Sequence, residues 1–316
     1  MFAFILNNQK SHKGIGIKLS FFLMLCSSLS EMQAANLNDI VSDDNSSSAI
    51  TEYASETWNI EIEPTSANDN PKRLNTENIF FYAYKDTYII PFSRTFNDTE
   101  DRQQNEIKFQ FSIKQPLFQY ADFKLNFGYT QKSFWQAYDQ EKSSPFRETN
   151  YNPELFIEIP ELSTSLGQFK GTIGYEHESN GEVVPYSRSW NRLYWGILYT
   201  IQGIGINYKM WYRQPEKEKE NPDDAEGDDN PDIHEYYGNS ELVLSLFIQE
   251  TLISLMSRMS LSHGKGTVQF SVSHPLPGDS VYGYFQYWNG YGESLIDYNR
   301  SLTKVGLGIM IKRSLF

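Results

Sequence analysis

The strongest constraint on the fold of this 316-residue chain is the alternation of apolar and polar side chains along many short segments. In residues 105–115 the side chains of Ile107, Phe109, Phe111 and Ile113 occupy every second position, with polar side chains between them. Successive side chains of a strand point to opposite faces, so this pattern predicts a strand with one apolar face. Segments of this kind, about twelve in number, occur at 77–93, 105–117, 122–136, 150–160, 168–180, 187–200, 203–213, 235–249, 251–262, 265–274, 280–291 and 302–312.

The number of these segments and the lengths of their connections indicate how the strands assemble. An even number of antiparallel strands can close without leaving a free edge, as a bilayer requires. Long polar stretches follow the odd-numbered segments and short turns follow the even-numbered ones, except at 263–266. Long loops at one end and short turns at the other are typical of outer-membrane barrels. We therefore predict an all-β fold, a twelve-stranded antiparallel transmembrane β-barrel.

Composition agrees with a barrel and limits the other classes. The chain carries 21 Tyr and 21 Phe, and its mean hydropathy is −0.53. After the N-terminal region it has no apolar run of about 20 residues, the length that a transmembrane helix needs. A soluble secreted β-sandwich is the alternative, but it would not explain the aromatic residues near strand ends, as in 282–291. The net charge of −13 argues against a nucleic-acid partner, because a phosphate backbone demands a basic surface.

The N-terminal region indicates export. Lysines precede an apolar run at 19–29, and small residues follow it, which predicts a signal peptide over residues 1–35. Residues 36–75 are rich in Asn, Asp, Ser and Glu and predict an acidic polar extension, which leaves 76–316 for the barrel. The only cysteine, Cys26, falls within the signal peptide. A lipid anchor on Cys26 is the competing interpretation, disfavoured because the preceding Leu25 is large.

One strand segment carries residues suited to acyl transfer. His177 and Ser179 share the apolar phase of 168–180, and Asn191 has the same phase in the next segment, so antiparallel pairing would set Asn191 beside His177. His177 could take the proton of the Ser179 hydroxyl while Asn191 fixes the imidazole tautomer. The apolar phase of a membrane barrel faces lipid, so these residues would lie outward at the extracellular rim. The spacing alone also fits a rim histidine and serine without a catalytic role.

Asparagine makes such a triad unusual. Because the Asn191 side chain is neutral, it cannot stabilise an imidazolium as a carboxylate would. The Ser-His-Asn triad would therefore be a weak catalyst unless another group supplied positive charge near the developing oxyanion.

The same residues carry a resemblance to a known family, bacterial outer-membrane phospholipase A. Stretches that resemble the family are HESNG at 177–181, SRSWNRLY at 187–194, YTQKSFWQ from Tyr129, SSPFRETNY from Ser143 and NGYGESLIDYN from Asn289, within a similarity that runs from roughly Thr76 to Phe316. The resemblance implies a barrel that hydrolyses acyl esters of phospholipids at the outer leaflet of the bacterial outer membrane, with phospholipase A1, phospholipase A2 and lysophospholipase activity. It also implies calcium as the cofactor and a homodimer as the active form.

The resemblance also implies roles for individual residues. Ser179 matches the nucleophile, His177 the base and Asn191 the residue that orients the base. Gln131 is similar to the family glutamine that supports this asparagine. The implied calcium ligands are Ser187, the backbone carbonyl of Glu182 and Ser144 from the partner subunit.

Two positions depart from the family pattern. Glu182 stands where the family has arginine, a change that a carbonyl ligand tolerates. Val184 stands where the family has an acidic residue of a second calcium site, which we expect to be absent or rebuilt. Calcium beside Ser179 would supply the positive charge that Asn191 cannot. A non-catalytic barrel, either porin-like or a degenerate lipase with a structural or surface role, is the alternative, and the intact triad set argues against it.

Other charged residues have simpler explanations. Glu176 and Glu178 have the inward phase and are expected to pair with Arg188 or Arg192. The acidic stretch 216–232 lacks the ligand spacing of an EF-hand and is expected to be a solvated extracellular loop.

Overall fold

The computed structural model describes residues 72–73, 81–97, 102–221, 223–224, 226–278 and 281–315. Every described residue belongs to one compact unit, Asn45–Phe316. The predicted signal peptide at 1–35 lies outside the described residues, as does the polar extension at 36–75 apart from residues 72–73.

Twelve long strands, β3 to β14, dominate the described residues, together with the two-residue strands β1 and β2 and the short helix α4. Their bounds are β1 (Lys72–Arg73), β2 (Tyr82–Ala83), β3 (Thr87–Thr95), β4 (Asn105–Tyr120), β5 (Phe123–Trp135), β6 (Phe146–Thr164), β7 (Gly167–Ser179), β8 (Ser189–Ile201), β9 (Ile204–Arg213), α4 (Ile233–Tyr237), β10 (Ser240–Ile248), β11 (Thr251–Ser260), β12 (Lys265–Pro275), β13 (Tyr282–Gly290) and β14 (Leu302–Lys312). No helix among the described residues is both long enough and apolar enough to cross a bilayer.

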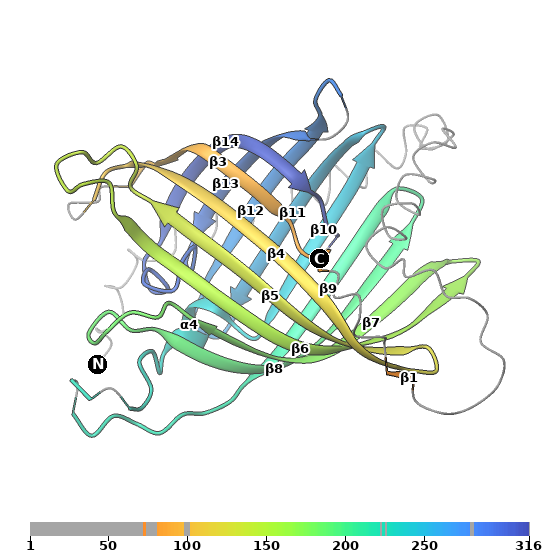
Figure 1. Cartoon of the computed structure of the whole chain (residues 1–316), viewed down its shortest axis with the longest axis horizontal. Coiled ribbons are helices and arrows are strands. Elements are labelled where there is room, and N and C mark those ends of the chain that lie inside the picture. The colour runs from red at the N-terminus through yellow and green to blue at the C-terminus, as the bar shows by residue number, and fades with distance from the viewer. Residues whose placement is uncertain are drawn as a thin grey trace, which may run out of the picture. The chain divides into compact units, whose positions relative to one another are not determined.

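The long strands close on themselves. Each strand from β3 to β13 pairs antiparallel with the next one in the chain, and β14 pairs with β3 (Figure 1). The two short strands β1 and β2 pair with β4. The predicted fold, a closed twelve-stranded antiparallel β-barrel, is confirmed.

The seam between β3 and β14 is irregular. β3 carries a bulge between Ile90 and Ser93 on its β4 side, and the β14 register shifts between Leu307 and Ile309. Pro91 lies in this bulge, where its missing N–H removes no ladder bond. Gly308 lies opposite, and a Cβ there would stand 2.1 Å from the carbonyl oxygen of Ile89. The bulge therefore accommodates a proline, and the close approach of the two strands requires a glycine.

Two of the predicted strands begin later than expected. The segment predicted from 235 starts as β10 at Ser240, because 233–237 forms α4 and Gly238 follows with a φ of 65°. The segment predicted from 77 forms its long strand only at Thr87, after Asp86 accepts hydrogen bonds from the N–H and hydroxyl of Ser314. A short helix in the first case and a tertiary contact in the second delay the start of the strand, and period-two alternation records neither.

The connections sort by length as predicted. Long ones gather at one end of the barrel, at the left of Figure 1, and short turns lie at the other end. At the β8 to β9 turn both Gln202 (φ 43°) and Gly203 (φ 87°) have positive φ, the conformation that matches the twist of a two-residue hairpin. Residues 261–264 form the short exception among the long connections.

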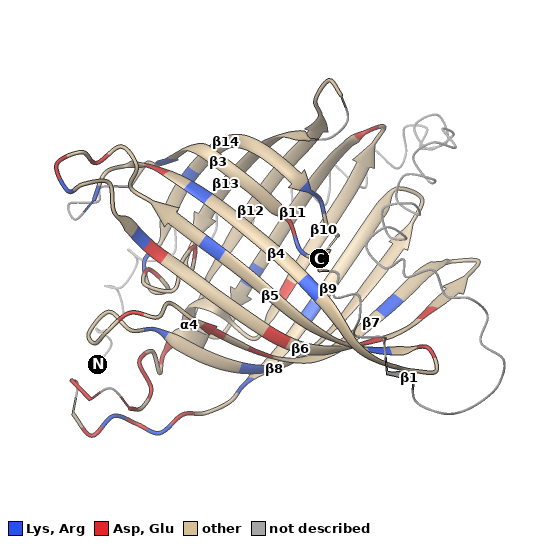
Figure 2. Ribbon diagram, in the orientation of Figure 1, with Lys and Arg blue, Asp and Glu red and all other residues tan. Residues whose placement is uncertain are grey.

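The wall has an apolar outside and a charged inside. On β7 the side chains of Ile173 and Tyr175 are exposed, whereas the side chain of Glu176, which has the opposite phase, is buried. Figure 2 shows charged positions scattered along the strands. Buried ion pairs link strands inside the barrel, such as Lys114 of β4 with Glu158 of β6 (2.7 Å) and Arg147 of β6 with Glu106 of β4 (2.9 Å). Charges placed inward leave the outer surface apolar, as a barrel in lipid requires.

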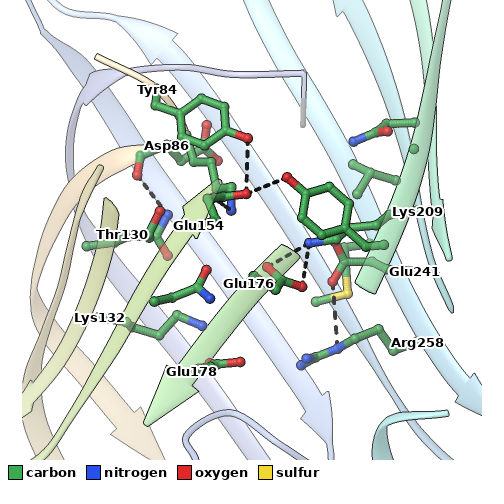
Figure 3. Close-up of a pocket in the computed structure, with 18 of the residues that line it drawn as sticks. Tyr84, Asp86, Thr130, Lys132, Glu154, Glu176, Glu178, Lys209, Glu241 and Arg258 are labelled. Atoms are coloured by element: carbon green, nitrogen blue, oxygen red, sulfur yellow. Dashed lines mark hydrogen bonds and ion pairs between the residues drawn. The ribbon is translucent and has the colours of Figure 1, made fainter. Parts of the chain in front are cut away.

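A cavity of about 240 Å³ remains in the interior. Figure 3 shows Tyr84, Lys209, Glu154 and Glu176 converging on it. Lys209 Nζ contacts both Glu176 oxygens at 2.8 and 2.9 Å, and the Tyr194 hydroxyl donates to Glu154 at 2.6 Å. Hydrogen bonds and ion pairs therefore connect inward side chains of β6 and β8 and of β7 and β9 around this cavity.

Candidate active site

The register between β7 and β8 brings the predicted active-site residues together. His177 lies directly opposite Asn191, and Ser179 lies opposite Ser189. All four side chains are partly buried on the outer face, in phase with exposed residues such as Tyr175 and Leu193. The outward position expected from alternation is thus the position that the structure gives them.

The inward-facing side chains of β8 anchor this strand from inside the barrel. Trp190 is fully buried, and its indole N–H donates to Glu178 at 3.0 Å. Arg192 lies over the Trp190 ring at 3.8 Å and pairs with Glu176 and Glu178 at 3.0 and 2.8 Å. The pairing expected for the two glutamates is therefore made with Arg192. Because Asn191 stands between these two anchored residues, its outward direction is fixed.

The imidazole of His177 has a defined partner. Its Nδ1 lies 2.9 Å from Oδ1 of Asn191, and Nδ2 of Asn191 donates to Oε1 of Glu216 at 3.1 Å. A carboxylate only accepts, so the amide turns its N–H to Glu216 and its oxygen to His177. This arrangement requires the proton on Nδ1 and leaves Nε2 with the lone pair that a base needs.

Ser179 ends β7 on the same face as His177. Its cross-strand neighbours are Tyr151 on β6 and Ser189 on β8. The next residue, Asn180, is buried and holds the following connection: its Oδ1 accepts the N–H of Arg188 at 2.9 Å, and its Nδ2 donates to the carbonyl of Tyr186 at 2.9 Å. This bonding shapes the segment that carries Glu182 and Ser187.

The residues implied as calcium ligands lie in two connections at the long-loop end. Ser187 Oγ donates to Oδ2 of Asp229 at 2.6 Å. Glu182 is exposed, and its N–H donates to Asn180 at 3.3 Å. Ser144 lies between β5 and β6, where its hydroxyl donates to the carbonyl of Ala137 at 3.1 Å. Among the described residues, no three His, Cys, Asp or Glu side chains form a group that could hold a metal.

The donor set at Ser187 nevertheless suits a hard cation. Calcium prefers oxygen ligands from carboxylates, carbonyls and hydroxyls. The Ser187 hydroxyl and the Asp229 carboxylate already meet at hydrogen-bond distance, and the carbonyl of Glu182 lies in the same connection as Ser187. The Ser187 hydroxyl and the Asp229 carboxylate are therefore oxygen donors of the kind that calcium takes.

The acidic connection between β9 and β10 is more ordered than expected. Arg213 contacts both oxygens of Asp228 at 2.7 Å, and Lys219 pairs with Asp229 at 2.5 Å. Through Glu216 and Asp229 it touches both Asn191 and Ser187. Much of the described part of this stretch is exposed, as expected of a solvated loop, but Glu216 and Asp229 are partly buried against the site.

The implied role of Gln131, support of the Asn191 side chain, would require it to lie beside Asn191, and it does not. It belongs to β5, and β6 and β7 stand between this strand and β8. Its side chain accepts from the Tyr129 hydroxyl at 3.0 Å and donates to Ser133 Oγ at 3.1 Å. In this structure Glu216 takes the N–H of Asn191 instead. Glu216 had no signal in the sequence, because it lies in a charged stretch without periodicity.

Comparisons with known proteins give this geometry a context. The sequence profile of a family described as Phospholipase A1 matches residues 63–311. Phospholipase A1 of Klebsiella pneumoniae is 35% identical over 254 residues, which cover 77% of this chain and 84% of the relative. Phospholipase A1 of Escherichia coli K12 is 34% identical over 258 residues, which cover 77% and 83%.

Solved structures are similar as well. Outer membrane phospholipase A from Escherichia coli superposes with a TM-score of 0.68 at 34% identity, covering 75% of this chain and 95% of that one. The Salmonella typhi outer membrane phospholipase, described as a dimer with bound calcium, gives a TM-score of 0.67 at 33% identity, covering 78% and 96%.

Proposed function

The chain belongs to the phospholipase A1 family and is an outer-membrane β-barrel, and from that premise we propose that it hydrolyses acyl esters of phospholipids with Ser179, His177 and Asn191. The observation that carries this proposal is the 2.9 Å contact between His177 Nδ1 and Asn191 Oδ1, on the outer face that also bears Ser179. A nucleophile for lipid esters is useful on a surface that faces lipid.

The proposed reaction is acyl transfer in two steps. His177 Nε2 accepts the proton of Ser179 Oγ as this oxygen attacks the ester carbonyl. Collapse of the tetrahedral intermediate breaks the ester C–O bond, and His177 returns the proton to the departing lysophospholipid oxygen. Water, activated by His177, then cleaves the acyl-enzyme and releases a fatty acid. Asn191 holds the imidazole in the required tautomer throughout.

Calcium is part of the proposal. Ser187 and the Glu182 carbonyl would hold the ion together with Ser144 from the partner subunit. The Asp229 carboxylate, which also pairs with Lys219, lies beside Ser187. When bound, calcium supplies positive charge near the developing oxyanion, which the neutral Asn191 cannot do. The dimer with bound calcium described for the Salmonella typhi protein supports both the ion and the homodimer.

The breadth of the activity rests on the resemblance alone. We include phospholipase A2 and lysophospholipase activity with the A1 activity for that reason. The domain bounds 1–35, 36–75 and 76–316, with a removed signal peptide, are proposed on the sequence pattern.

The test is hydrolysis of dioleoyl phosphatidylcholine by the purified full chain in detergent micelles with calcium. Ser179→Ala is expected to lower fatty-acid release by about 10³-fold or more, because the nucleophile is lost. Ser189→Ala is the matched control, since Ser189 lies opposite Ser179 on the same face, and it should retain activity. Normal release by the Ser179→Ala protein would rule out Ser179 as the nucleophile.

A further inference from the structure

We infer that Glu216 is a positioning residue for the proposed reaction: it locks the Asn191 amide, and thereby the His177 tautomer, and adds the negative charge that a Ser-His-Asn set lacks. The inference rests on the proposed function, and it names a residue outside the triad. The direct observation is the 3.1 Å hydrogen bond from Asn191 Nδ2 to Glu216 Oε1.

The place of Glu216 is set by an extension of the β8 to β9 ladder. The last register pair joins Arg192 to Arg213, and beyond it the Gln214 N–H donates to the Asn191 carbonyl at 2.8 Å. The Gln214 side chain also accepts from the Tyr175 hydroxyl at 2.9 Å. Asn191 is therefore held twice by one short segment, at its backbone carbonyl by residue 214 and at its side chain by residue 216.

The same segment is anchored on its other side. Arg213 contacts Asp228 through both carboxylate oxygens at 2.7 Å, and this pair is largely buried. Glu216 itself is only partly buried. Because residue 213 is held firmly, residues 214–216 leave the strand in a defined direction toward Asn191.

The first consequence is the orientation of the Asn191 amide. An asparagine side chain presents a donor and an acceptor of nearly the same shape, and histidine can adapt to either by changing tautomer. Without a partner that accepts only, the amide could turn its N–H to Nδ1, which would move the imidazole proton to Nε2. Nε2 would then have no lone pair free to accept the proton of Ser179. The Glu216 carboxylate excludes this arrangement because it can only accept.

The second consequence is electrostatic. The groups that face Glu216 are Asn191, Asp228, Arg213 and His177. Burial and then the Asp228 carboxylate raise the pKa of Glu216 above its ordinary value, while the Asn191 bond, Arg213 and His177 oppose the rise. His177 therefore interacts electrostatically with the Glu216 carboxylate, and the Asn191 amide lies between the two groups. Its protonated form, which appears during the reaction, is stabilised as long as Glu216 keeps its charge.

The first experiment compares Glu216→Gln with the wild-type full chain in micelles with calcium and dioleoyl phosphatidylcholine. We expect kcat to fall about tenfold with little change in KM, because the lost charge acts on the base and not on substrate binding. The acid limb of the kcat/KM profile should move to lower pH by roughly 0.5 to 1 unit, because the imidazolium loses a nearby negative charge. Glu220→Gln, in the same acidic connection but paired with exposed Lys217, should behave as wild type.

A double-mutant cycle tests whether Glu216 acts through Asn191. In the Asn191→Ala background, Glu216→Gln should change kcat by less than about twofold, since the amide it positions is gone. The inference would be overturned if Glu216→Gln lowered kcat by the same factor in the wild-type and Asn191→Ala backgrounds. It would also be overturned if Glu216→Gln left the acid limb of the wild-type profile unmoved.

A readout without turnover separates this inference from the proposed function. ¹⁵N NMR of histidine-labelled protein in lipid reports which ring nitrogen carries the proton, and a His177→Asn spectrum identifies the resonance. Wild type should show the Nδ1–H tautomer, and Glu216→Ala should populate the Nε2–H form. An unchanged tautomer in Glu216→Ala would sink the inference whatever the activity. An inactive wild type with a shifting tautomer would instead reject the proposed function and keep the positioning role.

Discussion

At the scale of single residues, the neutral amide of Asn191 connects His177, the proposed base, to the carboxylate of Glu216. A carboxylate at position 191 would stabilise an imidazolium better than an amide does. Here, however, the Asn191 side chain already lies 3.1 Å from the Glu216 carboxylate. Two carboxylates at such a distance cannot both ionise easily. The neighbourhood of residue 191 therefore selects an amide over an acid.

This leads to a prediction for Asn191→Asp. We expect its kcat at pH 7 to fall about tenfold, because one carboxyl keeps its proton and the contact with His177 is disturbed. Adding Glu216→Gln should restore part of the loss, since an amide can donate to the new carboxylate. Fatty-acid release measured for the single and double variants checks this. Combining Asn191→Asp with Glu220→Gln, which removes a distant charge, should not restore kcat.

What the sequence could predict at this scale follows from where each residue lies. His177 and Asn191 lie on paired strands, so alternation and antiparallel pairing were enough to place them together. Glu216 and Asp229 lie in a connection, where ion pairs such as Lys219 with Asp229 decide the path of the chain. Pairing rules do not extend to such a segment, so the sequence alone could not predict these contacts.

At the scale of elements, the strands were predictable in number and phase, but some of their ends were not. β7 and β8 follow the expected alternation closely because each has one lipid-facing and one inward face. The start of β3 depends on a contact between Asp86 and Ser314, residues at opposite ends of the barrel sequence. Local patterning has no access to such distant partners.

The seam between β3 and β14 gives a stability prediction. Gly308→Ala would put a methyl group 2.1 Å from the Ile89 carbonyl oxygen, and backbone there cannot yield easily. We expect the folded barrel to lose about 1–3 kcal/mol. The unfolding midpoint in urea, followed by the gel mobility shift of the folded barrel, measures the loss.

Gly205→Ala is the matched control for this change, because a Cβ on that strand glycine would make ordinary contacts, 3.5 Å from Ser245 at the nearest. Its midpoint should stay close to that of wild type. Equal midpoints for the two variants would show that the bulged seam does not limit stability.

At the scale of the whole molecule, the proposed calcium site needs two subunits. Ser144 and Ser187 lie in different connections of one chain, and Ser144 would serve the partner's site. A Ser144→Ala chain would retain its nucleophile but offer no ligand to its partner. A Ser179→Ala chain would offer the ligand but have no nucleophile.

Mixing these two chains should restore activity. Each homodimer is expected to be silent, whereas a mixed dimer has one complete site, so a random mixture should reach about a quarter of wild-type activity. Chelation with EDTA should abolish that activity, and adding calcium should restore it together with the yield of crosslinked dimers. An inactive mixture of folded proteins, or hydrolysis that survives EDTA, would contradict the shared calcium site.

The outward direction of Ser179, the proposed nucleophile, also determines what counts as substrate concentration. A nucleophile on the outer wall meets its ester from within the leaflet, by sideways diffusion of lipid, and not from the water above. The quantity that governs saturation is then the mole fraction of phospholipid in the surrounding film, not its molarity in the tube. The enzyme accordingly works in two dimensions, and an inert lipid or detergent that thins the film acts on it as dilution acts on a soluble enzyme.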